Sequence, residues 1–150
     1  MFRDLNEEHL QALIHGTMEE DNRVISELGG ELYEGVPAGL GKLSAKLPLF
    51  IVSNCQAGYI ETFLDWSTLR PLFKDFECWG NTGKPKADNL RAVIDRNGLR
   101  SPIYVGDTEG DQRAARDCRI PFIHMRYGFG ACEAPDVSFE TFGQFVDAQL

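Results

Sequence analysis

Short apolar runs that alternate with helical patterns are the feature that most restricts the fold of this chain. Residues 49–52 form a continuous apolar run that is partly β-branched, which is typical of a strand buried on both faces of a sheet. Further candidate strands are residues 76–79, 103–105 and 121–125. The helical patterns that follow the candidate strands cover residues 57–64, 87–97, 111–118 and 139–148. This alternation predicts an α/β fold with a parallel sheet and right-handed crossovers, in which ligands bind beyond the carboxyl ends of the strands.

The segment before the first candidate strand is predicted to be helical. Apolar residues recur every three or four positions over residues 6–28, which is the spacing of an amphipathic helix. Gly16 is expected to interrupt this helix, and Gly29 and Gly30 end the pattern. A short helix is expected over residues 40–46.

The charge balance excludes several kinds of partner. The chain has 23 acidic and 15 basic residues and a formal net charge of -8, so its overall field opposes binding to nucleic acid or to an anionic membrane surface. No apolar run approaches the roughly 20 residues that span a bilayer, and the N-terminal residues lack the pattern of a signal peptide. A cytoplasmic location is therefore expected.

The cysteines are far apart and are predicted to be free thiols: Cys55, Cys78, Cys118 and Cys132.

Polar residues follow the first candidate strand and precede the helix after the second. Ser53 and Asn54 come directly after residues 49–52, where a hydroxyl and the N–H groups of a helix start would face an anion. Helix capping is the alternative role for these two residues. Lys84 and Lys86 precede a helix, and a lysine there offers a positive charge to a phosphate unless it is a solvated loop residue. The sequence thus gives candidates for a phosphate site.

Two aspartates follow the third candidate strand. Asp107 comes directly after the strand and Asp111 opens the next helix, with Gly106 and Gly110 beside them. One or two carboxylates, water and a substrate phosphate are the ligands that Mg²⁺ prefers. The alternative is that Asp111 only caps its helix and Asp107 lies in a turn.

Taken together and in this order, the three stretches resemble motifs of the haloacid dehalogenase (HAD) superfamily of hydrolases, in its phosphoglycolate-phosphatase-like branch with a helical cap. Residues 51–54 resemble the second motif, residues 83–88 the third and residues 105–111 the fourth. The resemblance implies a Rossmann-like core and Mg²⁺-dependent hydrolysis of a small phosphorylated metabolite. It also implies catalytic roles for a serine and a lysine. Phosphate would be bound by Ser53, Asn54 and Lys86, and Mg²⁺ by Asp107 and Asp111.

The resemblance leaves two candidates for the catalytic lysine of the third motif. Lys84 with Pro85 resembles the common Lys-Pro form, whereas Lys86 resembles a variant in which lysine precedes a small and an acidic residue. We favour Lys86, because it stands closer to the helix and Leu90 then belongs to a buried stripe behind it.

The first motif of the superfamily, an Asp-x-Asp at the end of an N-terminal strand, has no counterpart in these residues. In the family the first Asp attacks phosphorus and the second is the general acid and base. We therefore interpret residues 1–32 as a remnant of the helical cap and residues 33–150 as the α/β core without its N-terminal central strand. The chain is then expected to be inactive alone. The alternative is a non-catalytic phosphate-binding, Mg²⁺-binding or protein-interaction remnant.

The strand missing from this pattern would lie, in the family, between the strands at residues 49–52 and 103–105. Leaving two apolar strand edges unpaired is costly, and three outcomes are open. The two strands pair directly and give a four-stranded sheet. Alternatively, a complementing chain, a homo-oligomer or a separately encoded piece supplies the strand. The third outcome is a truncated product that is marginally stable and prone to aggregate.

Overall fold

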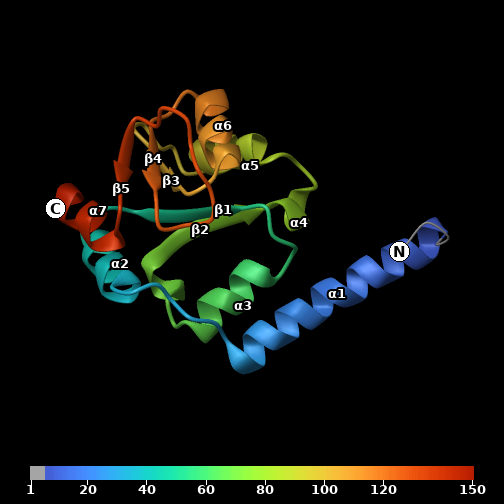
Figure 1. Ribbon diagram of the computed structural model, residues 1–150. Helices are drawn as coiled ribbons and strands as arrows, with labels where there is room; N and C mark the ends of the chain where they lie inside the picture. The colour runs from blue at the N-terminus through green and yellow to red at the C-terminus, as the bar shows by residue number, and fades with distance from the viewer. Residues whose placement is uncertain (1–5) are drawn as a thin grey trace.

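The computed structural model describes residues 6–150 and has an α/β fold with parallel strands, which confirms the predicted fold class (Figure 1). The helices are α1 (Glu7–Leu28), α2 (Val36–Ser44), α3 (Tyr59–Trp66), α4 (Trp79–Thr82), α5 (Lys86–Arg96), α6 (Glu109–Cys118) and α7 (Phe142–Gln149). The strands are β1 (Leu49–Ser53), β2 (Phe73–Cys78), β3 (Tyr104–Gly106), β4 (Phe122–Met125) and β5 (Val137–Phe139). A 3₁₀ turn, Arg70–Leu72, precedes β2.

The strands form two separate hydrogen-bonded groups. β1 pairs in parallel with β2, and β3, β4 and β5 form a second parallel sheet in that order. Within residues 6–150, β1 has no hydrogen-bonded neighbour other than β2, and β3 has none other than β4. The first outcome considered above, direct pairing of the two strands into one four-stranded sheet, is therefore wrong.

The burial of each strand follows from the division of the strands into two sheets. All residues of β4 are buried between its neighbours and the helices, whereas every residue of β1 and of β3 is only partly buried. The sequence predicts that residues 49–52 are buried on both faces, and the structure leaves them half-buried because one edge of β1 is open. The apolar core accordingly divides in two. One cluster lies between β4, α2 and α7 and the other between β2 and α3.

Helix α1 is continuous, so the predicted interruption at Gly16 is wrong. Asn6 caps the helix by accepting a hydrogen bond from His9 N at 2.8 Å, and one interior glycine costs only about 1 kcal/mol relative to alanine. The helix ends at Gly29, whose φ of 69° favours glycine. α1 projects from the body of the molecule and packs along α3 (Figure 1).

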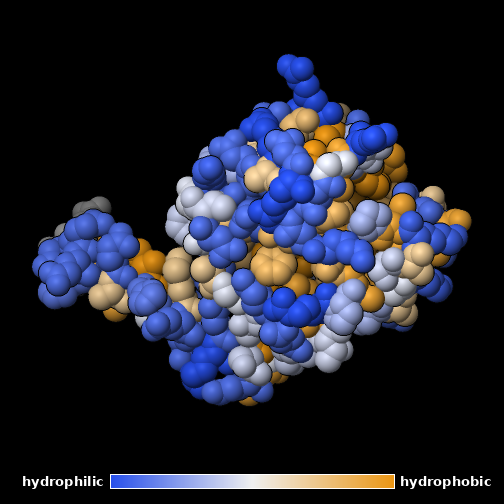
Figure 2. Space-filling view, turned by 180° about the vertical axis from the view of Figure 1, so that it is seen from behind, coloured by the Kyte–Doolittle hydropathy of each residue, from blue (hydrophilic) through white to orange (hydrophobic). Residues whose placement is uncertain are grey.

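The exposed surface of α1 is mainly polar, whereas the body of the molecule shows apolar surface between its polar side chains when it is viewed from behind (Figure 2). Leu13, Ile14 and Leu28 are the larger apolar exceptions on α1. None of the helices in residues 6–150 is long and apolar enough to cross a membrane. The four cysteines are free, as predicted.

Candidate functional site

The loop after β1 carries the first predicted site residues. Ser53 is half-buried, its Oγ accepts a hydrogen bond from Cys55 N at 3.2 Å, and Asn54 is exposed. Helix α3 begins only at Tyr59, with Gly58 at its N-cap. The alternative that Ser53 or Asn54 caps this helix is therefore wrong, and the helix begins two residues later than the predicted residue 57.

Lys86 lies at the first position of α5 and contacts the first turn of α6. Its Nζ is 2.5 Å from Asp111 Oδ1, and the two side chains are only 16% and 6% exposed. Lys84 is exposed, and its backbone N–H donates to Thr82 Oγ1 at 3.1 Å. Of the two candidate lysines, the structure thus brings Lys86 into the cluster of predicted site residues.

Asp111 has a capping role in addition to its ion pair. Its Oδ2 accepts hydrogen bonds from Thr108 Oγ1 at 2.7 Å, Thr108 N at 3.1 Å and Asp107 N at 3.2 Å. Thr108 Oγ1 accepts in turn from Asp111 N, which completes a capping box. Burial favours a higher pKa for Asp111, but the hydrogen bonds from Lys86 and Thr108 outweigh it and hold this pKa below its usual range. Asp111 is therefore an ionised carboxylate, and both of its oxygens accept hydrogen bonds.

Asp107 is approached closely by the loop after β4. Its Oδ2 accepts a hydrogen bond from Phe129 N at 2.7 Å. A Cβ added to Gly128 would lie 2.2 Å from Asp107 Cβ, and one added to Gly130 would lie 2.9 Å from Asp107 O. Only glycine permits this approach. The loop thus borders the candidate site, and the Phe129 side chain is exposed rather than packed under the sheet.

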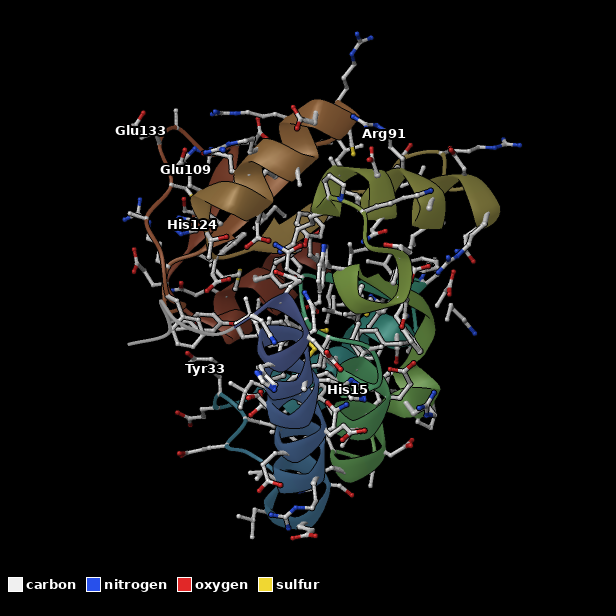
Figure 3. The ribbon with its side chains drawn as sticks, turned by 90° about the vertical axis from the view of Figure 1, so that its right-hand side faces the viewer. His15, Tyr33, Arg91, Glu109, His124 and Glu133 are labelled. Atoms are coloured by element: carbon white, nitrogen blue, oxygen red, sulfur yellow. The ribbon has the colours of Figure 1, made fainter. Side chains whose placement is uncertain are left out.

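Further contacts fix the same loop on α6 and β4. Glu133 O accepts hydrogen bonds from Gln112 Nε2 at 2.7 Å and from Arg116 at 3.1 Å, and the Nε2 of buried His124 lies 3.2 Å from Gly130 O. Figure 3 shows His124 beneath α6 and Glu133 in the loop beside it. Sequence reasoning missed this anchoring, for which the glycines at 128 and 130 were the available signal.

Tyr104 connects the carboxyl end of β1 to α6. Its Oη donates to Val52 O at 3.0 Å and lies 3.4 Å from Asp111 Oδ1. Burial, together with the negative charge of Asp111, raises the pKa of this phenol well above its usual value, so it stays a neutral hydrogen-bond donor. Neither Ser53 nor Asn54 hydrogen-bonds to Lys86 or Asp111 in the described part of the chain. Tyr104 is therefore the link between the two halves of the site, and sequence reasoning did not single it out.

The carboxylates fit Mg²⁺ only in part. Asp107 and Asp111 are the donor type that Mg²⁺ prefers, with water and a phosphate completing the coordination. Both oxygens of Asp111 already accept hydrogen bonds from Lys86 or from Thr108. Residues 6–150 bring together no group of three or more His, Cys, Asp or Glu side chains suited to a metal. Asp107 is consequently the better candidate ligand, and Asp111 could bind only if Lys86 gave way.

Comparisons with known proteins identify the family of this chain. Residues 1–125 match the family model described as Haloacid dehalogenase-like hydrolase. The chain is 28% identical over 134 residues to phosphoglycolate phosphatase of Escherichia coli (strain K12), a match that covers 83% of this chain and 53% of the relative. The corresponding Salmonella typhimurium protein is 27% identical over the same length. The chain thus spans about half the length of the curated relatives that it matches.

Solved structures share the fold. A predicted phosphatase from Clostridium acetobutylicum superposes with a TM-score of 0.80 at 20% identity, covering 99% of this chain and 73% of that one. A predicted phosphoglycolate phosphatase from Haemophilus somnus 129pt gives a TM-score of 0.79 at 19% identity, covering 97% and 69%. Motif order, fold and family model agree, and the chain belongs to the haloacid dehalogenase-like hydrolase family.

Proposed function

We propose that this chain forms the phosphate- and Mg²⁺-binding part of a phosphate monoester hydrolase that acts on a small phosphorylated metabolite. The observation that carries the proposal is the partly buried Lys86–Asp111 pair beside Asp107. It brings one cation and two carboxylates together beside the carboxyl end of β3, and ligands bind at such strand ends in parallel α/β folds. The phosphoglycolate phosphatases among the relatives support a small phosphorylated acid as the substrate class.

Each residue has a separate task in this proposal. Ser53 and Asn54 would hydrogen-bond the phosphoryl oxygens, and Lys86 would balance their charge while Asp111 orients its ammonium group. Asp107 would hold Mg²⁺, and Asp111, the second predicted ligand, would join it only if Lys86 gave way. When bound, the ion neutralises negative charge on the phosphate. Hydrolysis would split the ester P–O bond and release inorganic phosphate and an alcohol.

The attacking aspartate of the family has no counterpart among these residues, so we propose that the chain alone binds phosphate and Mg²⁺ without turnover. The uncatalysed hydrolysis of phosphate monoesters is among the slowest reactions that enzymes accelerate, by up to about 10²¹-fold. Binding groups without a nucleophile therefore leave the reaction slow.

Calorimetry with Mg²⁺ in the presence of inorganic phosphate tests the binding part. Saturable binding is expected for the wild-type chain and for Asp147→Asn, an exposed aspartate on α7, and at least tenfold weaker binding is expected for Asp107→Asn. Equal binding by Asp107→Asn and wild type would overturn the proposed site.

Hydrolysis of p-nitrophenyl phosphate tests the proposal that the chain alone has no turnover. Robust turnover by the chain alone that Asp107→Asn abolishes would show that a nucleophile is present after all.

A further inference from the structure

We propose that Asn22, on helix α1, is a positioning residue for the phosphate site: its amide group holds the loop of residues 54–58 and thereby orients the Ser53 hydroxyl that precedes this loop. The inference rests on the proposed function, because it explains how one predicted phosphate ligand is held in place before phosphate binds. The loop runs from the end of β1 to Gly58, the N-cap of α3.

Both ends of the Asn22 amide contact the loop. Its Nδ2 donates to Ala57 O at 3.0 Å, and its Oδ1 accepts from Gln56 Nε2 at 3.4 Å. A Cβ added to Gly58 would lie 3.1 Å from Asn22 Nδ2, and the φ of Gly58 is 81°, so glycine is favoured at this contact. Within residues 6–150, Asn22 is the only residue of α1 whose side chain hydrogen-bonds outside the helix.

Asn22 also interrupts the face of α1 that packs against α3. None of the residues of α1 is fully buried, and those that are partly buried are Leu10, Met18, Asn22 and Ile25. Positions 18, 22 and 25 have the spacing of one helix face. An apolar residue at position 22 would continue this stripe, whereas an amide that leaves water needs hydrogen-bond partners. The asparagine therefore fits the loop contact better than it fits the packing of two helices.

The loop conformation determines how the Ser53 hydroxyl can donate. Gly80 N donates to Cys55 O at 2.9 Å, and a Cβ added to Gly80 would lie 1.9 Å from Ala57 N, so α4 supports the loop closely. Cys55 N in turn donates to Ser53 Oγ at 3.2 Å. A hydroxyl that accepts from an N–H group keeps its own hydrogen to donate. The loop thus leaves this hydrogen for a phosphoryl oxygen.

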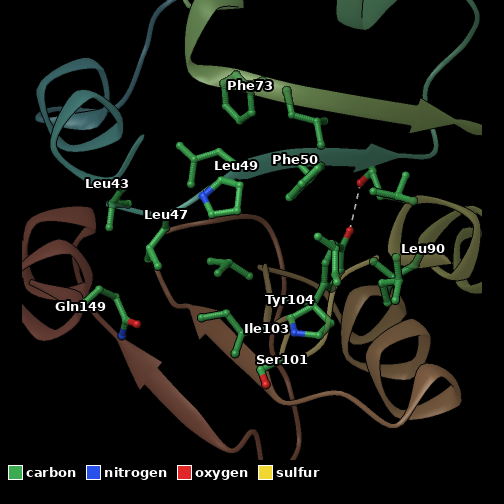
Figure 4. A pocket seen from close by; sticks show the side chains of 18 of the residues that line it. Leu43, Leu47, Leu49, Phe50, Phe73, Leu90, Ser101, Ile103, Tyr104 and Gln149 are labelled. Carbon is green, nitrogen blue, oxygen red and sulfur yellow. Dashed lines mark hydrogen bonds between the residues drawn. The ribbon is translucent and has the colours of Figure 1, made fainter. Parts of the chain in front are cut away.

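The backbone before Ser53 is fixed separately, by Tyr104. Figure 4 shows this side chain reaching from β3 to the carbonyl group of Val52 on β1, and the distance from Tyr104 Oη to Val52 O is 3.0 Å. Helix α1 therefore acts only on the backbone that follows Ser53. Ligands that are already ordered lose less conformational freedom on binding. Releasing the loop at Asn22 should consequently weaken phosphate binding while β1 stays in place.

Asn22→Leu tests the proposal, because leucine has nearly the shape of asparagine and extends the apolar stripe of α1. The bond to Ala57 O is exposed, so water can replace it. We expect the urea unfolding midpoint of the variant to equal or exceed that of wild type. In calorimetry with Mg²⁺, inorganic phosphate should bind about three- to tenfold more weakly. Unchanged phosphate affinity would overturn the proposal. Weaker binding together with lower stability would assign Asn22 a purely structural role and overturn it as well.

Two further variants locate the effect. Gln11 is exposed on the same helix and bonds only to Glu7, one turn away, so Gln11→Leu should keep the phosphate affinity within about twofold of wild type. Ser53→Ala removes the hydroxyl that the loop orients. In that background Asn22→Leu should weaken phosphate binding by less than about twofold. An equal loss from Asn22→Leu in both backgrounds, or from Gln11→Leu and Asn22→Leu, would overturn the positioning role.

Hydrogen exchange of the chain without phosphate separates this inference from the proposed function. The amides of residues 55–58 should exchange faster in Asn22→Leu than in wild type, with the amides of β4 unchanged. Equal exchange of these loop amides in the two chains would overturn the inference even where phosphate binds. A wild-type chain that binds no phosphate would overturn the proposed function and the role of Asn22 in binding, while faster loop exchange in the variant would still show that α1 holds the loop.

Discussion

Replacing Lys86 with methionine removes the charge that pairs with Asp111 while keeping a long unbranched side chain. Removing one partner of a buried ion pair costs about 3–5 kcal/mol, because the remaining charge is left uncompensated. Here Lys86 keeps 16% exposure, and Asp111 retains the hydrogen bonds from Thr108 and from Asp107 N. We therefore expect a smaller loss of unfolding free energy, about 2–3 kcal/mol.

Urea unfolding followed by circular dichroism measures this loss, and a constant slope m indicates that the unfolded state has not changed. Lys84→Met is the matched control, because Lys84 is exposed, and should stay within about 0.5 kcal/mol of wild type. A double-mutant cycle with Asp111→Asn should give a coupling above about 1 kcal/mol. If Lys86→Met and Lys84→Met were equally stable, the ion pair would not hold α5 against α6 and the reasoning would fail.

Two further predictions concern the loop beside Asp107 and the acid stability of the fold. Gly128→Ala places a Cβ 2.2 Å from Asp107 Cβ and should cost about 1–3 kcal/mol in urea unfolding. Gly41→Ala in α2, with nothing within 4 Å, should not destabilise the chain, and equal losses would contradict the close approach. Hydrogen bonds from Arg96 hold the pKa of Asp75 below its usual range. The stability that this carboxylate contributes is complete above about pH 4 and is lost as the pH falls through the lowered pKa. The gap in unfolding free energy between wild type and Asp75→Asn should therefore narrow below about pH 4, and a gap unchanged in acid would refute this.

The α/β class and the main elements were predictable because apolar periodicity is local. Residues 49–52 are the main part of β1, and the polar ends of β1 and β3 were identified from their position after apolar runs. Lys86 was favoured over Lys84 for its place near a helix, and it is the lysine that pairs with Asp111.

The features of the fold and the site that the sequence did not predict depend on contacts that no local pattern encodes. β5 has three residues and forms only because β4 pairs with it, and α4 is a single turn outside all of the predicted helices. The uninterrupted α1 shows that one glycine is too weak a signal to end a long helix. Tyr104 joins Val52 across 52 positions of sequence, a contact set by tertiary packing alone.

Hydrogen exchange of backbone amides, measured with and without Mg²⁺ and inorganic phosphate, tests most directly whether the residues after β1 and β3 form one binding site with Lys86. Amides that gain a partner exchange more slowly. Slower exchange confined to the loops after β1 and β3 and to the first turns of α5 and α6, with β2 and β5 unchanged, is the result that we predict. Unchanged exchange at saturating Mg²⁺ and phosphate, or equal slowing throughout the chain, would contradict the account.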